Sequence, residues 1–222
     1  MYNLSYFKEK DKQVLLEFLN DHPFAFLTGS DSKGAQVATQ IPILVEERGG
    51  EWYLQGHMMR NTDHEKAFRQ NEKVLAVFSG PHAYVSASWY SDPQIGSTWN
   101  YMSVHIKGEI NFLPKEGLIS FMKKLTLKFE DNDAKSPTVY DNLPEEFLKK
   151  MLPMIVAFEI KVEEMKNVFK LSQNRDEESY RNIITRLEEQ GGSSEDIANE
   201  MTKRIKDLFP PGVEWDGSKF MS

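Results

Sequence analysis

The chain has 222 residues, of which 40% are hydrophobic, 12% aromatic and 27% charged, with no cysteine and a formal net charge of −7. This composition excludes disulfides, thiolate metal sites, cysteine nucleophiles and a disordered chain. The negative charge opposes binding to a nucleic-acid backbone, and no apolar run reaches the ~20 residues of a membrane-spanning helix, so we expect a soluble, cytoplasmic protein.

Short strands separated by turns dominate the first half of the chain. Apolar residues at helical spacing predict a helix over Asp11–Asn20, which His22-Pro23 ends because proline cannot donate to the preceding turn. A second, shorter helix is expected at Thr62–Gln70. Pro42 within a strand suggests an edge position or a bulge, and Gly80-Pro81 suggests a turn. The strands expected here are Phe24–Thr28, Gln36–Glu46, Trp52–Gly56, Val74–Phe78 and Ala83–Ser86.

The second half alternates long strands with helices. Near the end of the chain, Gly191 suits the C-cap of one helix, and Ser193 with Asp196 can cap the next one. The elements expected in this half are strands at Trp99–Phe112 and Ile155–Val162, and helices beginning at Pro114, Glu145, Asp176 and Ser193.

These patterns together predict seven strands, most of them joined by turns. Parallel strands would need a crossover connection, usually a helix, between most pairs. The pattern therefore favours a mainly β fold with helices (α+β), in which an antiparallel barrel is dressed by helices.

The first candidate site lies where the third predicted strand leads into the short helix. Free backbone N–H groups at such a junction favour anions. Arg60 is suited to hold a phosphate through two parallel hydrogen bonds, supplemented by His64 or Lys66. The alternative is an ordinary helix start, capped by Asn61 or Thr62, with solvated charges.

Two further clusters carry more polar and aromatic residues than a plain barrel needs. Gly80–Tyr90 and Thr98–Tyr101 place aromatic rings beside hydroxyls and an amide, which suits a flat heterocycle; a dimer interface or rim packing is the alternative. Lys170–Arg175 could hydrogen-bond the edge of a ligand, or Ser172 or Asn174 could cap the following helix.

Metal and nucleotide chemistry find little support in the sequence. His64-Glu65 begins like a zinc-protease helix, but Phe68 stands where the second ligand would be. A zinc site built from His57, His64 and a carboxylate remains the alternative. There is no nucleophile elbow, phosphate-binding loop or dinucleotide-binding glycine motif.

Three motifs in the same order resemble the signature of the PaiB-like proteins, also called FMN-binding negative transcriptional regulators. They are Gly80-Pro-His-Ala-Tyr-Val-Ser-Ala-Ser-Trp-Tyr90, Thr98-Trp-Asn-Tyr-Met-Ser-Val-His105 and Lys170-Leu-Ser-Gln-Asn-Arg175. The resemblance covers about residues 1–190. It implies a split β-barrel of the FMN-binding type with a C-terminal helical extension: a domain over 1–190, a helical tail over 191–222, and a homodimer with flavin at the subunit interface.

The resemblance also implies which residues contact FMN. It places the phosphate where a strand feeds a short helix, the flavin ring along the backbone of the preceding strand, and a basic flavin contact at Lys170. The implied contacts are Thr39, Gln40, Ile41, Pro42, His57, Met58, Arg60, Asn61, His64, Lys66, Trp99, Asn100, Lys170, Ser172 and Gln173.

Several functions remain open at this point. The family implies an FMN-binding regulator; the rivals are a flavin-dependent oxidoreductase, a haem protein with His57 or His82 as ligand, and a DNA-binding regulator without cofactor. No catalytic side chain is assigned, so enzymatic activity stays undecided. Lys203, Arg204 and Lys206 lie among acidic residues, which is typical of a solvated helix face rather than a recognition helix.

Overall fold

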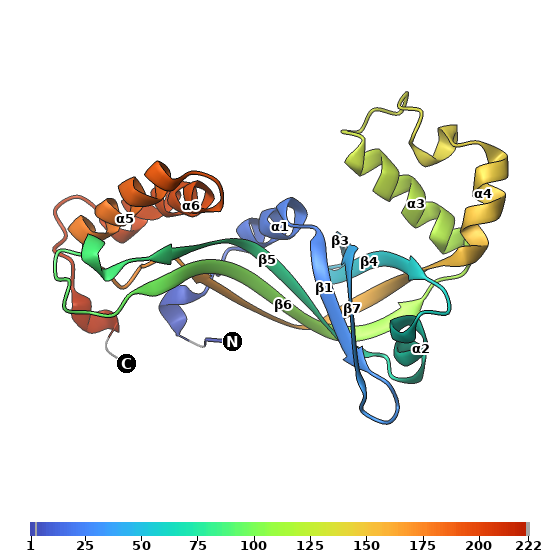
Figure 1. The fold of residues 1–222 in the computed structure, drawn as a ribbon, viewed down its shortest axis with the longest axis horizontal. Coiled ribbons are helices and arrows are strands. Elements are labelled where there is room, and N and C mark those ends of the chain that lie inside the picture. Colours follow the sequence, from blue (N-terminus) through green and yellow to red (C-terminus); the bar gives the residue numbers. More distant parts are fainter. Residues whose placement is uncertain (3, 221–222) are drawn as a thin grey trace. The chain divides into compact units, whose positions relative to one another are not determined.

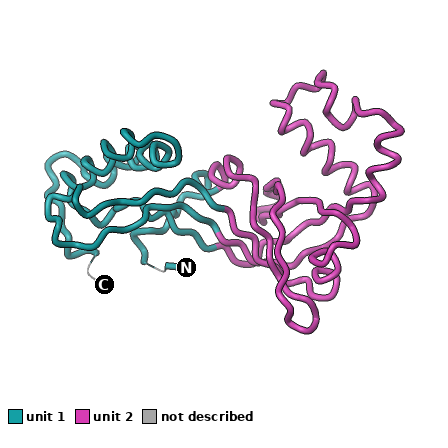
Figure 2. Tube along the Cα trace, in the orientation of Figure 1, with its two compact units in different colours: residues 1–15, 79–104, 166–222 teal, residues 16–78, 105–165 magenta. Residues whose placement is uncertain are grey.

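The computed structural model describes residues 1–2 and 4–220, which form two compact units (Figure 2). Unit 1 comprises residues 1–15, 79–104 and 166–220, and unit 2 comprises residues 16–78 and 105–165. Three long strands run through both units: β5 (Lys73–Val85), β6 (Thr98–Phe112) and β7 (Ile155–Lys170).

All seven strands belong to one sheet, in the order β2-β1-β5-β6-β7-β4-β3 (Figure 1). The two strands that end this order, β2 and β3, are consecutive in the chain, and only Ile43 separates them. Because one residue joins the two ends of the order, the sheet must curl back on itself, as in a barrel. The four remaining strands are β1 (Phe24–Ser30), β2 (Gln36–Pro42), β3 (Leu44–Arg48) and β4 (Glu51–Met59).

Unit 2 holds the curled part of the sheet and its core. Leu27, Leu54, Phe78 and Phe158 are fully buried there. Glycine suits position 56 of β4, because a Cβ there would press against the ring of Phe158. The helices that lie in this unit or enter it are α1 (Lys12–Asp21), α2 (Asp63–Gln70), α3 (Lys115–Phe129) and α4 (Glu145–Met151).

Unit 1 contains the other ends of β5, β6 and β7, together with α5 (Glu177–Gln190) and α6 (Ser193–Leu208). The two helices follow one another and pack together, and Tyr180, Ile183, Ile197 and Met201 are fully buried. The Tyr180 hydroxyl donates to the Met201 carbonyl at 3.1 Å, which ties α5 to α6.

The predicted number of strands is correct, but several of the predicted boundaries are wrong. β4 continues past Gly56 to Met59, and β7 continues past Val162 to Lys170. The strand expected at Gln36–Glu46 is two strands, since β2 ends at Pro42 and β3 begins at Leu44. The turn expected at Gly80-Pro81 is absent, because β5 continues through it to Val85. Proline's fixed φ suits an extended strand, and the residue before it is also biased to extended conformations, so the pair is compatible with either structure.

The predicted caps are confirmed in part. Thr62 caps α2 by accepting from the Glu65 N–H at 3.3 Å, and Gly191 is the C-cap of α5 with φ 68°. Ser193 is not a cap: its hydroxyl bonds the backbone of His82, and Gly192 stands at the N-cap of α6. The cap of α5 is likewise neither Ser172 nor Asn174. It is Asp176, whose carboxylate accepts from the Ser179 N–H at 2.9 Å.

Candidate functional site

Arg60 is anchored to the backbone in a way that leaves part of its guanidinium free. It directly follows β4, and its N–H donates to the Met154 carbonyl at 2.8 Å. Its Nε donates to the Ile155 carbonyl at 3.0 Å. Nη1 and Nη2 have no hydrogen-bond or ion-pair partner in the part of the chain that the structure describes. Arg60 therefore presents two cationic nitrogens from a fixed position, as bidentate phosphate binding requires.

The backbone N–H groups at the start of α2 are less available than the sequence predicts. The Thr62 hydroxyl accepts from Glu65 N, and the Asp63 carboxylate accepts from His64 N at 2.8 Å. The N–H of Asn61, which has a left-handed φ of 63°, donates to Oε2 of Glu65 at 3.1 Å. The prediction that free N–H groups of this junction attract an anion is therefore wrong for these three groups.

The Glu65 side chain bonds groups on both sides of it along this junction, the Asn61 N–H and the Arg69 guanidinium. This side chain is buried and pairs with Nε of Arg69 at 2.5 Å. Burial alone would raise the pKa of the Glu65 carboxyl, but the hydrogen bonds from Arg69 and from the Asn61 N–H outweigh it and lower the pKa below its usual value. The ionised carboxylate fixes the chain just before α2, where Arg60 lies.

His64 is also fully engaged within the protein. Its Nε2 lies 3.0 Å from the Thr62 hydroxyl, and its Nδ1 lies 3.1 Å from Oδ1 of Asp63. Of the predicted phosphate ligands, Arg60 and Lys66 therefore remain as exposed cations that can reach an added group.

The predicted ring-binding segment, Thr39 to Pro42, is the last part of β2. This strand ends the sheet order and pairs only with β1 on one side, with Thr39 opposite Leu27 and Ile41 opposite Ala25. Ile41 is buried, so its side chain belongs to the core and only its backbone can serve a ligand. The second backbone edge of β2 has no strand neighbour in the sheet order, so its N–H and C=O groups suit the polar edge of a flat ring.

His57 and Met58 lie on β4 just before this junction. Met58 is buried, and the His57 ring lies 5.7 Å from the ring of Phe121 on α3. Nδ1 of His57 is buried and makes no hydrogen bond within the described residues. Burial lowers the pKa of His57 below its usual 6.5. The neutral ring therefore packs as part of the apolar contact between β4 and α3.

This environment predicts acid-dependent stability. Because the folded-state pKa lies below the unfolded value, the unfolded chain binds the proton more readily, and stability is lost as the pH falls below 6.5. As the pH falls below 6.5, we expect the free energy of unfolding of the parent protein to decrease relative to that of His57→Leu. The expected decrease is up to about 1.4 kcal/mol per pH unit.

Urea unfolding measured at a series of pH values checks this expectation. The control is His82→Leu, at an exposed position. Burial also lowers the pKa of His105, but all three proteins contain His105, so its contribution cancels in the comparison. Parallel pH profiles for the parent and His57→Leu would show that His57 is not the cause.

In unit 1, three predicted contacts form an internal network instead of facing outward. Asn100 is fully buried; its Oδ1 accepts from the Ser172 hydroxyl at 3.0 Å, and its Nδ2 lies 3.5 Å from Sδ of Met201. Gln173 donates to the Phe169 carbonyl at 2.6 Å and accepts from the Leu171 N–H at 2.8 Å. These bonds fix the chain as it leaves β7.

Trp99 and Lys170 differ from that network because they are accessible. Trp99 is 54% exposed, with Tyr84 and His82 at ring-centroid distances of 5.9 Å and 6.2 Å. Lys170, the last residue of β7, is half-buried, and its Nζ donates to the Thr98 hydroxyl. The contacts Asn100–Ser172 and Thr98–Lys170 show that the second and third sequence motifs meet.

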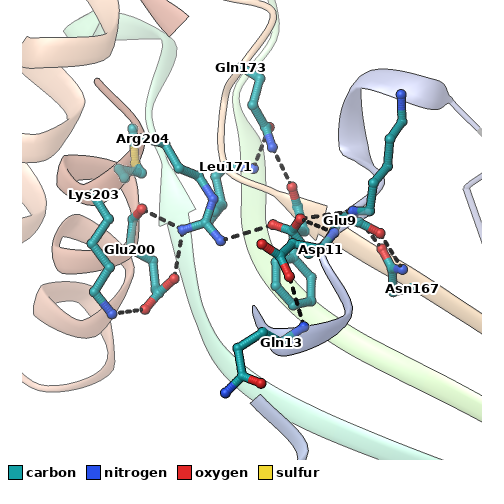
Figure 3. Close-up of polar contacts among 12 residues, drawn as sticks. Glu9, Asp11, Gln13, Asn167, Leu171, Gln173, Glu200, Lys203 and Arg204 are labelled. Carbon is teal, nitrogen blue, oxygen red and sulfur yellow. Dashed lines mark hydrogen bonds and ion pairs between the residues drawn. The ribbon is translucent and has the colours of Figure 1, made fainter. Parts of the chain in front are cut away.

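Figure 3 shows that the N-terminal segment and α6 belong to the same part of unit 1. Asn167 of β7 accepts from the Glu9 N–H at 2.8 Å and donates to the Glu9 carbonyl at 3.0 Å. Arg204 of α6 pairs with Oε2 of Glu200 at 2.7 Å and lies 3.6 Å from Oε2 of Glu9. The domain boundary at Gly191 stays a prediction, but this network connects α6 to the N-terminal segment and, through Glu9, to β7.

The predicted site residues thus fall into two groups. Thr39–Pro42, His57, Met58, Arg60, Asn61, His64 and Lys66 lie in unit 2, and Trp99, Asn100, Lys170, Ser172 and Gln173 lie in unit 1. The prediction did not include Thr98 or Tyr2, although the Lys170 side chain contacts both. Their sequence positions carry no signal, since these contacts form only when distant segments meet.

The described residues offer neither a metal site nor a membrane-spanning helix. No group of three or more His, Asp or Glu side chains among residues 1–2 and 4–220 is placed to hold a metal ion. None of the helices within the same residues is both long enough and apolar enough to span a bilayer.

Comparison with known proteins places the chain among flavin-associated sequences. A family model described as "Putative FMN-binding domain" matches residues 1–164. The chain is 33% identical over 207 residues to the Protease synthase and sporulation protein PAI 2 of Bacillus subtilis (strain 168), covering 93% of this chain and 99% of that protein. An uncharacterized protein of Emericella nidulans is 24% identical over 244 residues, covering 92% and 97% of the two chains.

Solved structures agree with the fold. The FAD and heme binding protein from Mycobacterium smegmatis matches with a TM-score of 0.55 and 16% identity over 73% of this chain and 72% of that chain. The flavocytochrome Anf3 from Azotobacter vinelandii matches with a TM-score of 0.55 and 17% identity over 82% and 78%. The predicted fold, mainly β with helices in a split barrel, is confirmed.

Proposed function

This chain belongs to the FMN-binding domain family, as its three motifs predicted, and from this premise we propose that it is a homodimeric, cytoplasmic FMN-binding regulator similar to PAI 2. FMN is its cofactor. When bound, FMN supplies the ability to accept and donate electrons, and the protein supplies its binding and orientation.

The observation that supports the proposed binding mode is that Arg60 is anchored while two of its guanidinium nitrogens are free. Its backbone N–H and its Nε are held by two carbonyls of the segment 154–155, while Nη1 and Nη2 stay available. In our proposal these two nitrogens bind the FMN phosphate, and Lys66 adds a second positive charge. The free backbone edge of β2 at Thr39 and Gln40 binds the polar edge of the flavin ring.

The dimer is proposed from an exposed apolar face beside that strand. Phe24 and Phe26 of β1 are 61% and 42% exposed, and they lie opposite Pro42 and Gln40 of β2. Two large aromatic side chains in solvent are costly unless another surface covers them, and a second copy of this face is the occupant we propose. The molecular mass in solution, measured by light scattering, decides between monomer and dimer.

FMN binding has a direct test. Protein purified from cells is expected to be yellow, and cofactor-stripped protein is expected to quench the fluorescence of added FMN with a stoichiometry of one per chain. Riboflavin, which lacks the phosphate, is expected to bind at least about 10-fold more weakly, because it forfeits charge-assisted hydrogen bonds of about 1.5–3 kcal/mol each. A colourless protein that takes up no FMN would contradict the proposal.

The same preparation separates the rival functions. A flavin-dependent oxidoreductase would bleach its bound flavin when a reduced nicotinamide cofactor is added, and a haem protein would show a Soret band. A DNA-binding regulator would show steeply salt-dependent binding to an operator. Against direct DNA binding, Lys203 and Arg204 of α6 are already paired with Glu200, at 2.6 Å and 2.7 Å.

A further inference from the structure

Arg175 differs from every other arginine of unit 1. Arg181, Arg186 and Arg204 each pair with a glutamate at 2.7–3.0 Å. In the described part of the chain, the Arg175 guanidinium has no carboxylate within ion-pair distance. In unit 2, Arg48 and Arg69 also pair with glutamates, so Arg60 is the other described arginine without a carboxylate partner.

The carboxylate next to it in sequence is committed elsewhere. Oδ1 and Oδ2 of Asp176 accept from the Ser179 N–H and hydroxyl at 2.9 Å and 2.7 Å, and Oδ2 also accepts from the Ser91 hydroxyl at 3.1 Å. Three hydrogen bonds hold Asp176 as the cap of α5, so it does not neutralise Arg175.

A second cation without a carboxylate partner lies close to the first. Nζ of Lys170 donates to the neutral Thr98 hydroxyl and lies 5.6 Å from the centre of the Tyr2 ring. Burial lowers the pKa of Lys170, and the positive charge of Arg175 lowers it further. Two like charges therefore share a partly desolvated region, which costs free energy unless an anion joins them.

The buried hydroxyl of Tyr90 lies at the same place and lacks an acceptor. Tyr90 is 5% exposed, and no acceptor for its O–H lies within hydrogen-bond distance in the described residues. The positive charge of Arg175 acts on this hydroxyl and opposes the rise in the Tyr90 pKa that burial causes. The Arg175 guanidinium lies 4.5 Å from the centre of the Tyr90 ring. A buried donor without an acceptor destabilises the folded chain, so an unfilled acceptor position is expected beside it.

We propose that Lys170, Arg175 and Tyr90 form a binding site for a phosphate-type oxyanion of a second ligand, separate from the FMN phosphate. The guanidinium donates two parallel N–H groups, the ammonium supplies a further donor and the second charge, and the phenol supplies an O–H. The inference goes beyond the proposed function, which assigns the FMN phosphate to Arg60 and Lys66 in unit 2. It gives Lys170, which the family resemblance implies as a flavin contact, to the second ligand instead. The oxyanion has two sources to distinguish, free phosphate and a phosphorylated small molecule.

Titration of the FMN-saturated protein with inorganic phosphate and with pyrophosphate, followed by calorimetry at constant ionic strength, tests the proposal. We expect saturable binding of at least one probe. Lys170→Gln and Arg175→Gln are each expected to weaken it about 10-fold or more, and Tyr90→Phe about 3- to 10-fold, from the usual values of charged and neutral hydrogen bonds. Pyrophosphate binding more tightly would indicate a phosphorylated molecule, and equal affinities would indicate free phosphate.

Controls keep a folding defect apart from loss of the site. Lys203→Gln and Arg181→Gln remove exposed cations of unit 1 that already pair with glutamates, and should leave phosphate affinity unchanged. Lys170→Arg should restore part of the affinity lost in Lys170→Gln. Absence of saturable binding, equal losses in the controls, or displacement of phosphate by FMN from the cofactor-free protein would overturn the proposal. The last result would assign these residues to the flavin site, while FMN binding itself would still stand.

Discussion

Replacing Arg60 by glutamine is expected to weaken FMN binding by about 10- to 100-fold. Nη1 and Nη2 are the free donors that its anchored position presents, and glutamine offers no charge and a single amide group in their place. Hydrogen bonds to a charged group contribute about 1.5–3 kcal/mol, which corresponds to this range of affinity. Fluorescence titration of the cofactor-stripped protein with FMN measures the change.

Arg60→Lys and Arg181→Gln make the result specific. Lysine keeps the charge but loses the two parallel donors and the Nε bond to Ile155, so we expect an affinity between those of the parent and Arg60→Gln. Arg181 is exposed and pairs with Glu177 on α5, so its loss should leave FMN affinity unchanged. If riboflavin affinity fell as much as FMN affinity in Arg60→Gln, the residue would not act on the phosphate.

The position of Arg60 depends on the hydrogen bonds made by the residues that follow it. Glu65 fixes the Asn61 N–H just after Arg60, and its side chain is buried against Arg69. These bonds hold the chain next to Arg60, the phosphate ligand that we propose, and a group held in its binding position binds more tightly.

The sequence predicts the bounds of an element well where hydrophobic periodicity indicates them. It predicts them poorly where a proline is the main local signal. Helical spacing placed α1 within one residue of each end, and the caps Thr62 and Gly191 are correct. The errors at Pro42 and at Gly80-Pro81 arise because proline fits both a turn and an extended strand. Pairing with distant strands decides between them, and a local pattern does not contain that information.

The motifs indicate where candidate site residues lie but not what their side-chain atoms contact. Residue types suggested Asn100 and Ser172 as ligand contacts, but their side chains bond each other across 72 positions in the sequence. Likewise, nothing local indicates that both ring nitrogens of His64 are engaged. Hydrogen-bond satisfaction depends on tertiary neighbours, so the sequence could not separate ligand contacts from residues that brace the chain.

The same limit explains why the roles proposed for Tyr90 and Arg175 were not predicted. Both residues lie inside the candidate clusters, where Tyr90 is one of several aromatics that suit a flat heterocycle and Arg175 is one of the charges that could bond the edge of a ligand. The burial of Tyr90 and the lack of an acceptor for its hydroxyl emerge only once α5 and the strand ends are in place. A motif residue whose polar atom stays unsatisfied in the folded chain is a better guide to function than the motif alone.

Replacing Gly108 by alanine is expected to lower the free energy of unfolding by at least about 3 kcal/mol, or to prevent folding. A Cβ at this position of β6 would overlap the Lys161 carbonyl oxygen and lie 2.8 Å from Cγ2 of Ile160. The first contact is with the backbone of β7, so relieving it requires the two strands to move apart. Urea unfolding followed by circular dichroism measures the loss.

Two other glycines calibrate this expectation. At Gly96 a Cβ meets nothing within 4 Å and the backbone is unstrained, so Gly96→Ala should stay within about 0.5 kcal/mol of the parent. At Gly56 the obstacle is the Phe158 ring, a side chain that can turn, so Gly56→Ala should fall between the two. The order of the three free energies of unfolding tests whether the backbone contact between β6 and β7 excludes a side chain at position 108. Equal unfolding midpoints for Gly108→Ala and Gly96→Ala would show that the strands do not approach this closely.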